Sequence, residues 1–302
     1  MIAPARAMDN REALRQGMAS LRAANVPSHT LAAELFLMHV LGRDRAWIYT
    51  HPENPLNPAD AGRYFALIDR RAAGEPTQYL TGKQEFWGLE FEVTPAVLIP
   101  RPETEHVVEV VLERLGERGI KINMRTGGPS PFLRIADVGT GSGCLAVALA
   151  QELPHAQIVA TDLSAAALEV ARRNAERHHV VDRFRFVQTN LLESVGEESS
   201  FDVIVSNPPY VAREEAGQLP CEVRQHEPDA ALFGGPSGFE MYGRLIEQAP
   251  ALLRSRGILI LELGFNSLDH VRSFLYGQPA WVNVSVTNDL AGIPRVIAAQ
   301  RS

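Results

Sequence analysis

The sequence has little cysteine and no long apolar run. Cys144 and Cys221 are the only two cysteines among 302 residues, and they are far apart. A disulfide framework and a cysteine-rich zinc site both need more thiols, so we expect neither, and we expect no metal. The most apolar stretch, Ile258–Leu263, is far shorter than the roughly 18 residues that span a bilayer. We therefore expect a cytoplasmic protein that is not embedded in a membrane.

An excess of positive charge is also missing. The chain carries 29 basic and 36 acidic residues, which gives a formal net charge of −7. Proteins that bind nucleic acid through a basic surface have the opposite balance, so direct nucleic-acid binding is not expected. The 23 glycines and 20 prolines follow no period, which excludes a collagen-like chain. The length suggests about two folded domains of roughly 100–200 residues each.

The N-terminal part of the chain has the periodicity of helices. Apolar side chains recur every three or four residues, as in Leu14, Met18 and Leu21. We predict a small helical domain over 1–80. A linker over 81–105 follows it, because the segment Phe86–Val93 nearly alternates apolar with polar residues around a glycine, as a short hairpin does.

Strand and helix patterns alternate in the rest of the chain. Runs such as 133–138 and 157–161 are typical of buried strands, and each is followed by a helical pattern. This order predicts an α/β domain over 106–302, with a parallel sheet that is doubly wound by helices. The last two strand-like runs, 281–286 and 295–299, leave no room for a crossover helix between them. We expect these two to be antiparallel neighbours.

A glycine-rich turn joins the first of these strands to its helix. Gly139, Gly141 and Gly143 follow the strand directly, and Asp162 ends the next strand. Such glycines let backbone amides approach a ligand at a helix N-terminus, and such an acid can accept both hydroxyls of a ribose. Because Cys144 replaces the last glycine of the dinucleotide fingerprint, a pyrophosphate cradle is disfavoured. The alternative is a turn that only allows close packing, with Asp162 as a helix cap.

The fourth strand ends in the tetrapeptide Asn207-Pro-Pro-Tyr210, and we expect a long loop after it. Ligands bind at this carboxyl edge in doubly wound sheets. Pro208 and Pro209 donate no backbone N–H and hold an extended turn, which leaves nearby carbonyls free to accept hydrogen bonds. The Asn207 side chain offers an acceptor and a donor, and Tyr210 offers a flat face. Together they suit a planar NH2 group.

This tetrapeptide also indicates a chemistry. An amide or aromatic amino nitrogen is a poor nucleophile, because its lone pair is delocalised. Hydrogen bonds from its two N–H groups to the Asn207 oxygen and the Pro208 carbonyl would orient it and stabilise its growing positive charge. The methyl donor must then be a strong electrophile, such as the sulfonium of S-adenosylmethionine. The alternative is a purely structural turn.

These residues resemble the class I S-adenosylmethionine-dependent methyltransferases. Within them the closest resemblance is to the HemK-type (PrmC-like) glutamine N5-methyltransferases, which modify the Gly-Gly-Gln loop of peptide-chain release factors. The motifs that carry it cover most of the chain: Pro76–Gly82, Glu85–Trp87, Leu98–Glu105, Asp137–Gly141, Asn207–Tyr210 and Glu227–Pro228. The resemblance implies a mostly parallel, seven-stranded Rossmann-like sheet with an antiparallel C-terminal strand. It also implies that the helical N-terminal domain binds the release factor.

Roles for individual residues follow from the same resemblance. It implies S-adenosylmethionine as cofactor and Asn207, Pro208 and Tyr210 as catalytic residues. The whole tetrapeptide, Pro209 included, would bind the substrate amide. The expected cofactor-binding residues are Asp137, Gly139, Thr140, Gly141, Ser142, Gly143, Asp162, Asn190, Leu191 and Asn207. Asp137 is placed to face the ammonium of the methionine moiety.

The chain departs from the family at one pair of positions. The family usually has an acid followed by an aromatic residue beside the adenine, where this sequence has Asn190 and Leu191. Asn190 can still hydrogen-bond the adenine, and Leu191 can cover the ring without stacking.

Three alternatives stay open. A sister family methylates a glutamine of a large-subunit ribosomal protein and shares the tetrapeptide, but the segment Arg101–Glu105 favours the release-factor branch. A nucleic-acid amino methyltransferase would act on a flipped adenine and needs a basic target domain, whereas residues 1–80 are not conspicuously basic. A non-catalytic binding protein on the same fold is disfavoured by the intact glycines, Asp162 and Asn207.

Overall fold

The computed structural model describes residues 8–119, 132–196 and 201–302, and the chain divides into two compact units. The first unit comprises the residues up to Gly82 together with Pro220–His226. The second comprises Lys83–Leu219 and Glu227–Ser302. The first unit is thus built from two stretches that lie far apart in the sequence.

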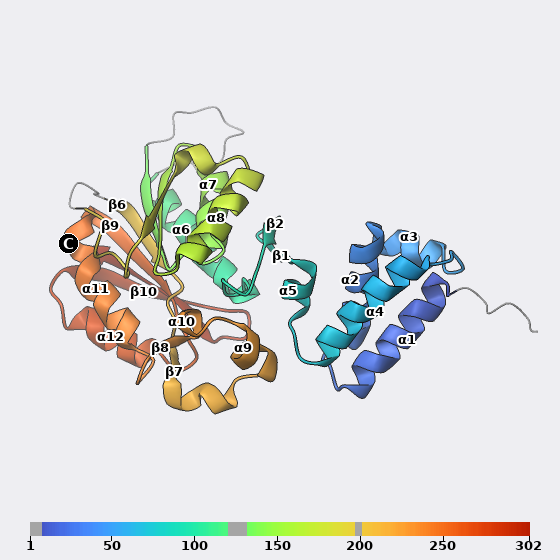
Figure 1. Cartoon of the computed structure of the whole chain (residues 1–302). Helices are drawn as coiled ribbons and strands as arrows, with labels where there is room; N and C mark the ends of the chain where they lie inside the picture. Colours follow the sequence, from blue (N-terminus) through green and yellow to red (C-terminus); the bar gives the residue numbers. More distant parts are fainter. Residues whose placement is uncertain (1–7, 120–131, 197–200) are drawn as a thin grey trace, which may run out of the picture. The chain divides into compact units, whose positions relative to one another are not determined.

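The first unit is helical (Figure 1). Its first helix begins after Asp9, whose side chain accepts a hydrogen bond from the Glu12 backbone N–H at 2.9 Å and so caps the helix. Phe36 and Tyr64 are fully buried between the helices. The predicted helical N-terminal region is confirmed. Its helices are α1 (Asn10–Ala23), α2 (His29–Leu41), α3 (Arg45–Thr50), α4 (Pro58–Ala72), α5 (Thr77–Thr81) and α9 (Cys221–His226).

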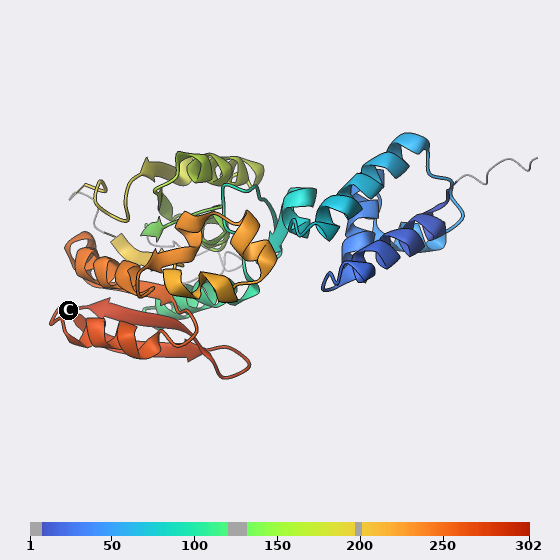
Figure 2. The ribbon, with the colours of Figure 1, turned by 60° about the horizontal axis from the view of Figure 1, so that its bottom comes forward.

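The second unit contains a seven-stranded sheet in the order β10-β11-β9-β6-β3-β4-β5. Each neighbouring pair from β9 to β5 is parallel, whereas β11 is antiparallel to both β9 and β10. Figure 2 shows this C-terminal hairpin, in red, at one edge of the sheet. The predicted fold class is confirmed. The strands are β3 (Arg134–Val138), β4 (Gln157–Asp162), β5 (Phe184–Gln188), β6 (Phe201–Ser206), β9 (Leu253–Glu262), β10 (Trp281–Asn288) and β11 (Pro294–Arg301).

Helices cover both faces of this sheet (Figure 1). Successive side chains of a strand point to opposite faces, so in β3 Ile135 packs into one core while Ala136 and Val138 pack into the other. The burial of both faces explains why these strands read as continuous apolar runs. One face carries α6 (Glu105–Glu117), α7 (Cys144–Glu152) and α8 (Ala165–Arg177), and the other carries α11 (Glu240–Leu252) and α12 (Leu268–Tyr276).

The predicted hairpin is present as β1 (Lys83–Phe86) and β2 (Leu89–Glu92), which pair antiparallel. Trp87 and Gly88 form its two-residue turn with φ of 55° and 69°, the left-handed values that such turns require. The Trp87 backbone N–H donates to Glu105 at 2.7 Å. The hairpin is therefore fixed to the start of α6.

The segment after the tetrapeptide contains short elements where a loop is expected. β7 (Val211–Ala212) pairs in parallel with β8 (Phe233–Gly235), and η4 (Arg213–Gln218) and α10 (Asp229–Leu232) lie between them in sequence. Two glycines permit this, because a Cβ on Gly234 would lie 2.4 Å from the Pro209 carbonyl oxygen and one on Gly238 2.5 Å from the Tyr210 carbonyl oxygen. The backbone of this segment thus packs directly on the tetrapeptide. None of the described helices is long and apolar enough to cross a membrane.

Candidate active site

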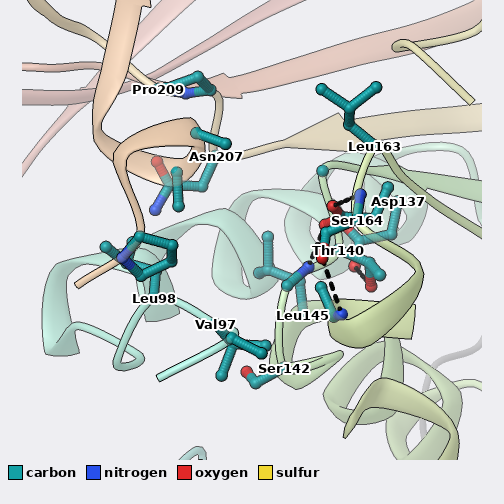
Figure 3. A pocket seen from close by; sticks show the side chains of 18 of the residues that line it. Val97, Leu98, Asp137, Thr140, Ser142, Leu145, Leu163, Ser164, Asn207 and Pro209 are labelled. Carbon is teal, nitrogen blue, oxygen red and sulfur yellow. Dashed lines mark hydrogen bonds between the residues drawn. The ribbon is translucent and has the colours of Figure 1, made fainter. Parts of the chain in front are cut away.

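A pocket of about 420 Å³ lies within the second unit, at the carboxyl ends of β3, β4 and β6. Figure 3 shows Asn207 and Leu98 on one side of it and Asp137 and Thr140 on the other. This volume lies in the range of roughly 300–1,000 Å³ that is usual for small-molecule sites. The predicted site residues that line it are Asp137, Gly139, Thr140, Gly141, Ser142, Asp162, Asn190, Leu191, Asn207 and Pro209.

The glycines of the turn have two different environments. Gly139, Gly141 and Gly143 all have left-handed φ, at 71°, 54° and 79°. A Cβ on Gly139 or Gly141 would meet nothing within 4 Å, so the backbone there borders open pocket. A Cβ on Gly143 would instead meet the Cβ of Ala171 in α8 at 3.0 Å. The first two glycines therefore expose the backbone to a ligand, and the third allows α7 and α8 to pack closely.

This difference predicts a stability effect at the third glycine. Gly143→Ala is expected to lower the free energy of unfolding by about 1–3 kcal/mol, because the new methyl group overpacks Ala171 and the backbone keeps a left-handed φ. Urea unfolding measures this change. The control is Gly217→Ala in the same unit, where a Cβ meets nothing within 4 Å. Equal stability of the two variants would contradict the packing role.

Asp162 braces the glycine turn from the end of β4. Its Oδ2 accepts a hydrogen bond from the Gly141 backbone N–H at 2.9 Å, and its Oδ1 accepts one from the Ser164 N–H at 2.9 Å. Burial raises the pKa of this carboxyl group, and the backbone hydrogen bonds oppose that shift. An ionised carboxylate has about four acceptor positions, so both oxygens keep capacity for a ligand in the pocket. The alternative of Asp162 as the helix cap is wrong, because Ser164 caps α8 by accepting a hydrogen bond from the Ala167 N–H at 3.2 Å.

Asp137 presents a buried oxygen without a partner. Its side chain is 1% exposed, and its Oδ2 accepts a hydrogen bond from the Thr140 hydroxyl at 2.6 Å. Its Oδ1 has no hydrogen-bond partner in the described part of the chain. Burial raises the pKa of Asp137 to about 7. A buried, unsatisfied carboxylate oxygen in a pocket wall fits a cationic donor such as an ammonium group.

The tetrapeptide contributes Asn207 and Pro209 to the pocket wall. The Asn207 Nδ2 donates to the hydroxyl of Thr104 at 3.1 Å, which fixes the side-chain amide across the end of β6. Pro208 is buried and is not among the lining residues, although its backbone lies between two that are. Gly143, another predicted cofactor-binding residue, is also not among the residues that line the pocket. The Pro209 carbonyl faces Gly234 and is therefore turned toward β8.

The sequence predicts that the Tyr210 ring offers a flat face to a planar group, but in the structure the ring is largely covered by the protein. Its ring packs against the backbone of Gly264, where a Cβ would lie 2.5 Å from the ring. Burial raises its pKa to about 12. The ring is not among the groups that line the pocket, so its predicted contact with a substrate stays a prediction.

Several lining residues were not singled out from the sequence. Leu163 follows Asp162, is 61% exposed and lies at the pocket together with Leu191. The backbone of Leu191 has φ 56° and accepts a hydrogen bond from Thr161 through its carbonyl. The sequence could have indicated Leu163, because it directly follows Asp162 at the end of a predicted strand. The other lining residues outside the prediction include Val97, Leu98, Pro100, Thr104, Ala230, Ala231 and Phe233.

An ion pair between a buried acid and a partly exposed arginine joins two of these lining segments. Arg101 donates to Glu227 at 2.6 Å, and the Glu227 side chain is only 2% exposed. The other Glu227 oxygen accepts a hydrogen bond from the Ile99 N–H at 3.3 Å. The segment around Pro100 and the one that begins at Pro228 are therefore fastened together at the pocket wall.

Two family models match the chain. The PrmC N-terminal domain matches residues 12–82, and the methyltransferase small domain matches residues 124–221. The second match contains both the glycine turn and the tetrapeptide.

Curated proteins match over nearly the full length. A release factor glutamine methyltransferase of Koribacter versatilis is 42% identical over 97% of this chain and 99% of its own. One of Nitratidesulfovibrio vulgaris is 40% identical over 96% of this chain and 94% of its own. Both alignments therefore span the two compact units of the chain.

Solved structures share the fold at low sequence identity. The hMettl16 catalytic domain in complex with an RNA hairpin has a TM-score of 0.56 at 19% identity, and the match covers 77% of this chain and 81% of that one. A methyltransferase from Pyrococcus furiosus has a TM-score of 0.50 at 21% identity, with coverages of 71% and 90%. These two likenesses concern the fold alone. The near-full-length matches to curated proteins show that the chain belongs to the release factor glutamine methyltransferase family.

Proposed function

We propose that this protein transfers a methyl group from S-adenosylmethionine to the side-chain amide nitrogen (N5) of the glutamine in the GGQ motif of peptide-chain release factors. Its family membership supports this activity and substrate. The observation that carries the proposal is the position of Asn207, whose amide group stands at the wall of a pocket formed by the glycine turn.

The pocket residues fit S-adenosylmethionine. The unpartnered Oδ1 of Asp137 suits the ammonium of the methionine moiety, and the open backbone at Gly139 and Gly141 suits close approach of the ligand. Asp162 would accept the ribose hydroxyls, and Asn190 and Leu191 would contact the adenine. The cofactor supplies a methyl group on a sulfonium, an electrophile that needs no metal for transfer.

The protein's part in the reaction is to orient a weak nucleophile. The Asn207 Oδ1 and the Pro208 carbonyl would each accept one N–H of the glutamine amide, which points its nitrogen into the pocket. Both acceptors stabilise the positive charge that grows on this nitrogen. The nitrogen would bond to the methyl carbon as the S–C bond breaks with its electron pair left on sulfur, now a neutral thioether, and it would give up one proton to water. Pro209 would keep the turn rigid. Tyr210 is proposed to contact the substrate amide.

The helical first unit is proposed to bind the release factor at a surface outside its glutamine loop. We propose no nucleic-acid partner, because the chain has a net charge of −7. We place the reaction in the cytoplasm, where both cysteines, Cys144 and Cys221, would stay as the free thiols that the structure shows.

The proposed contact of Asp137 predicts a pH dependence of cofactor binding. Burial raises the pKa of Asp137 to about 7, so the group is mostly neutral at about pH 5.5 and half ionised at about pH 7. An α-amino group with a pKa of about 8 stays charged over this range. Affinity should therefore increase roughly 16-fold from about pH 5.5 to about pH 7, which calorimetry measures. The same slope in Asp137→Asn would contradict the assignment.

A substrate panel tests the proposed function. The enzyme is incubated with labelled methyl donor and, in parallel, with purified release factors, ribosomal proteins and DNA. Label on a release factor alone supports the proposal. Label on a ribosomal protein or on adenine would replace it with one of the other two activities.

A further inference from the structure

Asn207 depends on a buried neighbour for its orientation. Its Nδ2 donates to Oγ1 of Thr104 at 3.1 Å, across 103 positions of sequence. Thr104 is 3% exposed and ends the short helix η1 (Pro102–Thr104), directly before α6. An asparagine amide has a donor end and an acceptor end. When the donor end faces Thr104, the acceptor end is left for the pocket.

The direction of this hydrogen bond depends on a third residue, Glu262. It is the last residue of β9, where Leu261 is in register with Ser206 of β6, so Glu262 and Asn207 follow at adjacent positions on neighbouring strands. Glu262 is 3% exposed. Burial raises its pKa to about 7, and a hydrogen bond from the Thr104 side chain acts in the opposite direction.

The hydroxyl of Thr104 has only one proton. When Glu262 is ionised, its carboxylate can only accept hydrogen bonds, so Thr104 would donate its proton to Glu262. Its lone pairs are then left for Asn207, which must turn its NH2 toward Thr104. If the amide were reversed, it would present an NH2 to the NH2 of the incoming glutamine, and two donors would face each other. The ionised form of Glu262 would therefore set the direction of the hydrogen bonds through Thr104 to Asn207.

We infer that Thr104 and Glu262 are positioning residues that hold the Asn207 side chain with its oxygen toward the pocket. This inference rests on the proposed role of Asn207 and adds two residues that act through Asn207. It also gives a role to a buried acid, Glu262, that the proposed cofactor site does not use.

The first test compares Thr104→Val with Thr104→Ser in steady-state kinetics on a purified release factor. Valine keeps the shape of threonine and loses the hydroxyl, whereas serine keeps the hydroxyl. We expect Thr104→Val to lower kcat by about tenfold, the effect of one lost hydrogen bond, with the cofactor Kd unchanged. Thr104→Ser should restore kcat to near the wild-type value. A merely structural role would not be rescued by the smaller side chain.

Three results would overturn the inference. These are a wild-type kcat in Thr104→Val, an equal loss in Thr104→Ser, or a loss of kcat that only follows a weakened cofactor Kd. Asn207→Ala is assayed in parallel to separate the two claims. If Asn207→Ala is inactive and Thr104→Val is fully active, only the positioning role fails. If Asn207→Ala is fully active, the proposed role of Asn207 is wrong, and the positioning role that rests on it is wrong as well.

A pH profile at saturating cofactor gives a second readout. The like charge of Glu103 raises the pKa of Glu262, and the opposite charges of Arg295 and Arg101 lower it. Tyr210, Tyr242 and Cys144 also interact electrostatically with Glu262.

When Glu262 takes up a proton, it can donate to Thr104, and Thr104 can then donate to the Asn207 oxygen and reverse the amide. Wild-type kcat should therefore fall below about pH 7, whereas Thr104→Val should be slow and lack this acid limb. The same limb in Thr104→Val would contradict the relay.

Discussion

Asn207→Ala is expected to lower kcat by about 10²–10³-fold, the usual effect of removing one preorganised hydrogen-bonding group from a transition state. The variant loses the acceptor that orients the glutamine nitrogen and stabilises its developing charge. Its cofactor affinity should change far less than kcat, because Asn207 is one of several expected cofactor contacts and Asp137, the glycine turn and Asp162 carry most of that binding in our proposal. Initial rates of methyl transfer to a purified release factor measure the loss, and calorimetry measures the affinity.

The control for this variant is Asn283→Ala. Asn283 is an exposed asparagine of β10 in the same unit, and its side-chain amide donates a hydrogen bond to Gln300 at 3.2 Å, far from the tetrapeptide in sequence. It should keep the wild-type kcat. Undiminished turnover in Asn207→Ala would remove the proposed role of the tetrapeptide.

Asp162→Ala is expected to weaken cofactor binding by about 1–3 kcal/mol, or roughly 5- to 150-fold in Kd. The variant loses the acceptors proposed for the ribose, and it also leaves the backbone N–H groups of Gly141 and Ser164 without their partner. The glycine turn is then less well held in the shape that borders the pocket. Calorimetric titration with S-adenosylmethionine measures the change.

Two further variants separate these contributions. Asp162→Asn keeps one acceptor oxygen and the shape of the side chain, so its Kd should lie between those of the wild type and the alanine variant. Asp182→Ala removes an exposed carboxylate from η3 (Val181–Arg183) and should bind like the wild type. Wild-type affinity in Asp162→Ala would contradict the ribose assignment.

The sheet could be predicted from the sequence because a strand that is buried on both faces has apolar residues at consecutive positions. Ile135 and Ala136 serve opposite cores, so both had to be apolar. The glycine turn was visible for a similar local reason, since left-handed φ at three alternate positions, 139, 141 and 143, strongly favours glycine. The antiparallel hairpin of β10 and β11 followed from the short connection alone.

The rest of the site depends on contacts between distant residues. The sequence shows Thr104 beside a proline-rich segment and Glu262 at the end of an apolar strand, but nothing local indicates that both converge on Asn207. The packing of Tyr210 on Gly264 and of Gly234 on the Pro209 carbonyl is also long-range. Local pattern thus predicts which elements meet at the carboxyl edge, and tertiary packing decides which side chains face the pocket.

Tandem mass spectrometry of a release factor after incubation with the enzyme and S-adenosylmethionine tests the central claim most directly. The account predicts one added methyl group on the side-chain amide of the GGQ glutamine, formed by the wild type and formed far more slowly by Asn207→Ala. An unmodified glutamine with wild-type enzyme, or a methyl group on another residue, would contradict it.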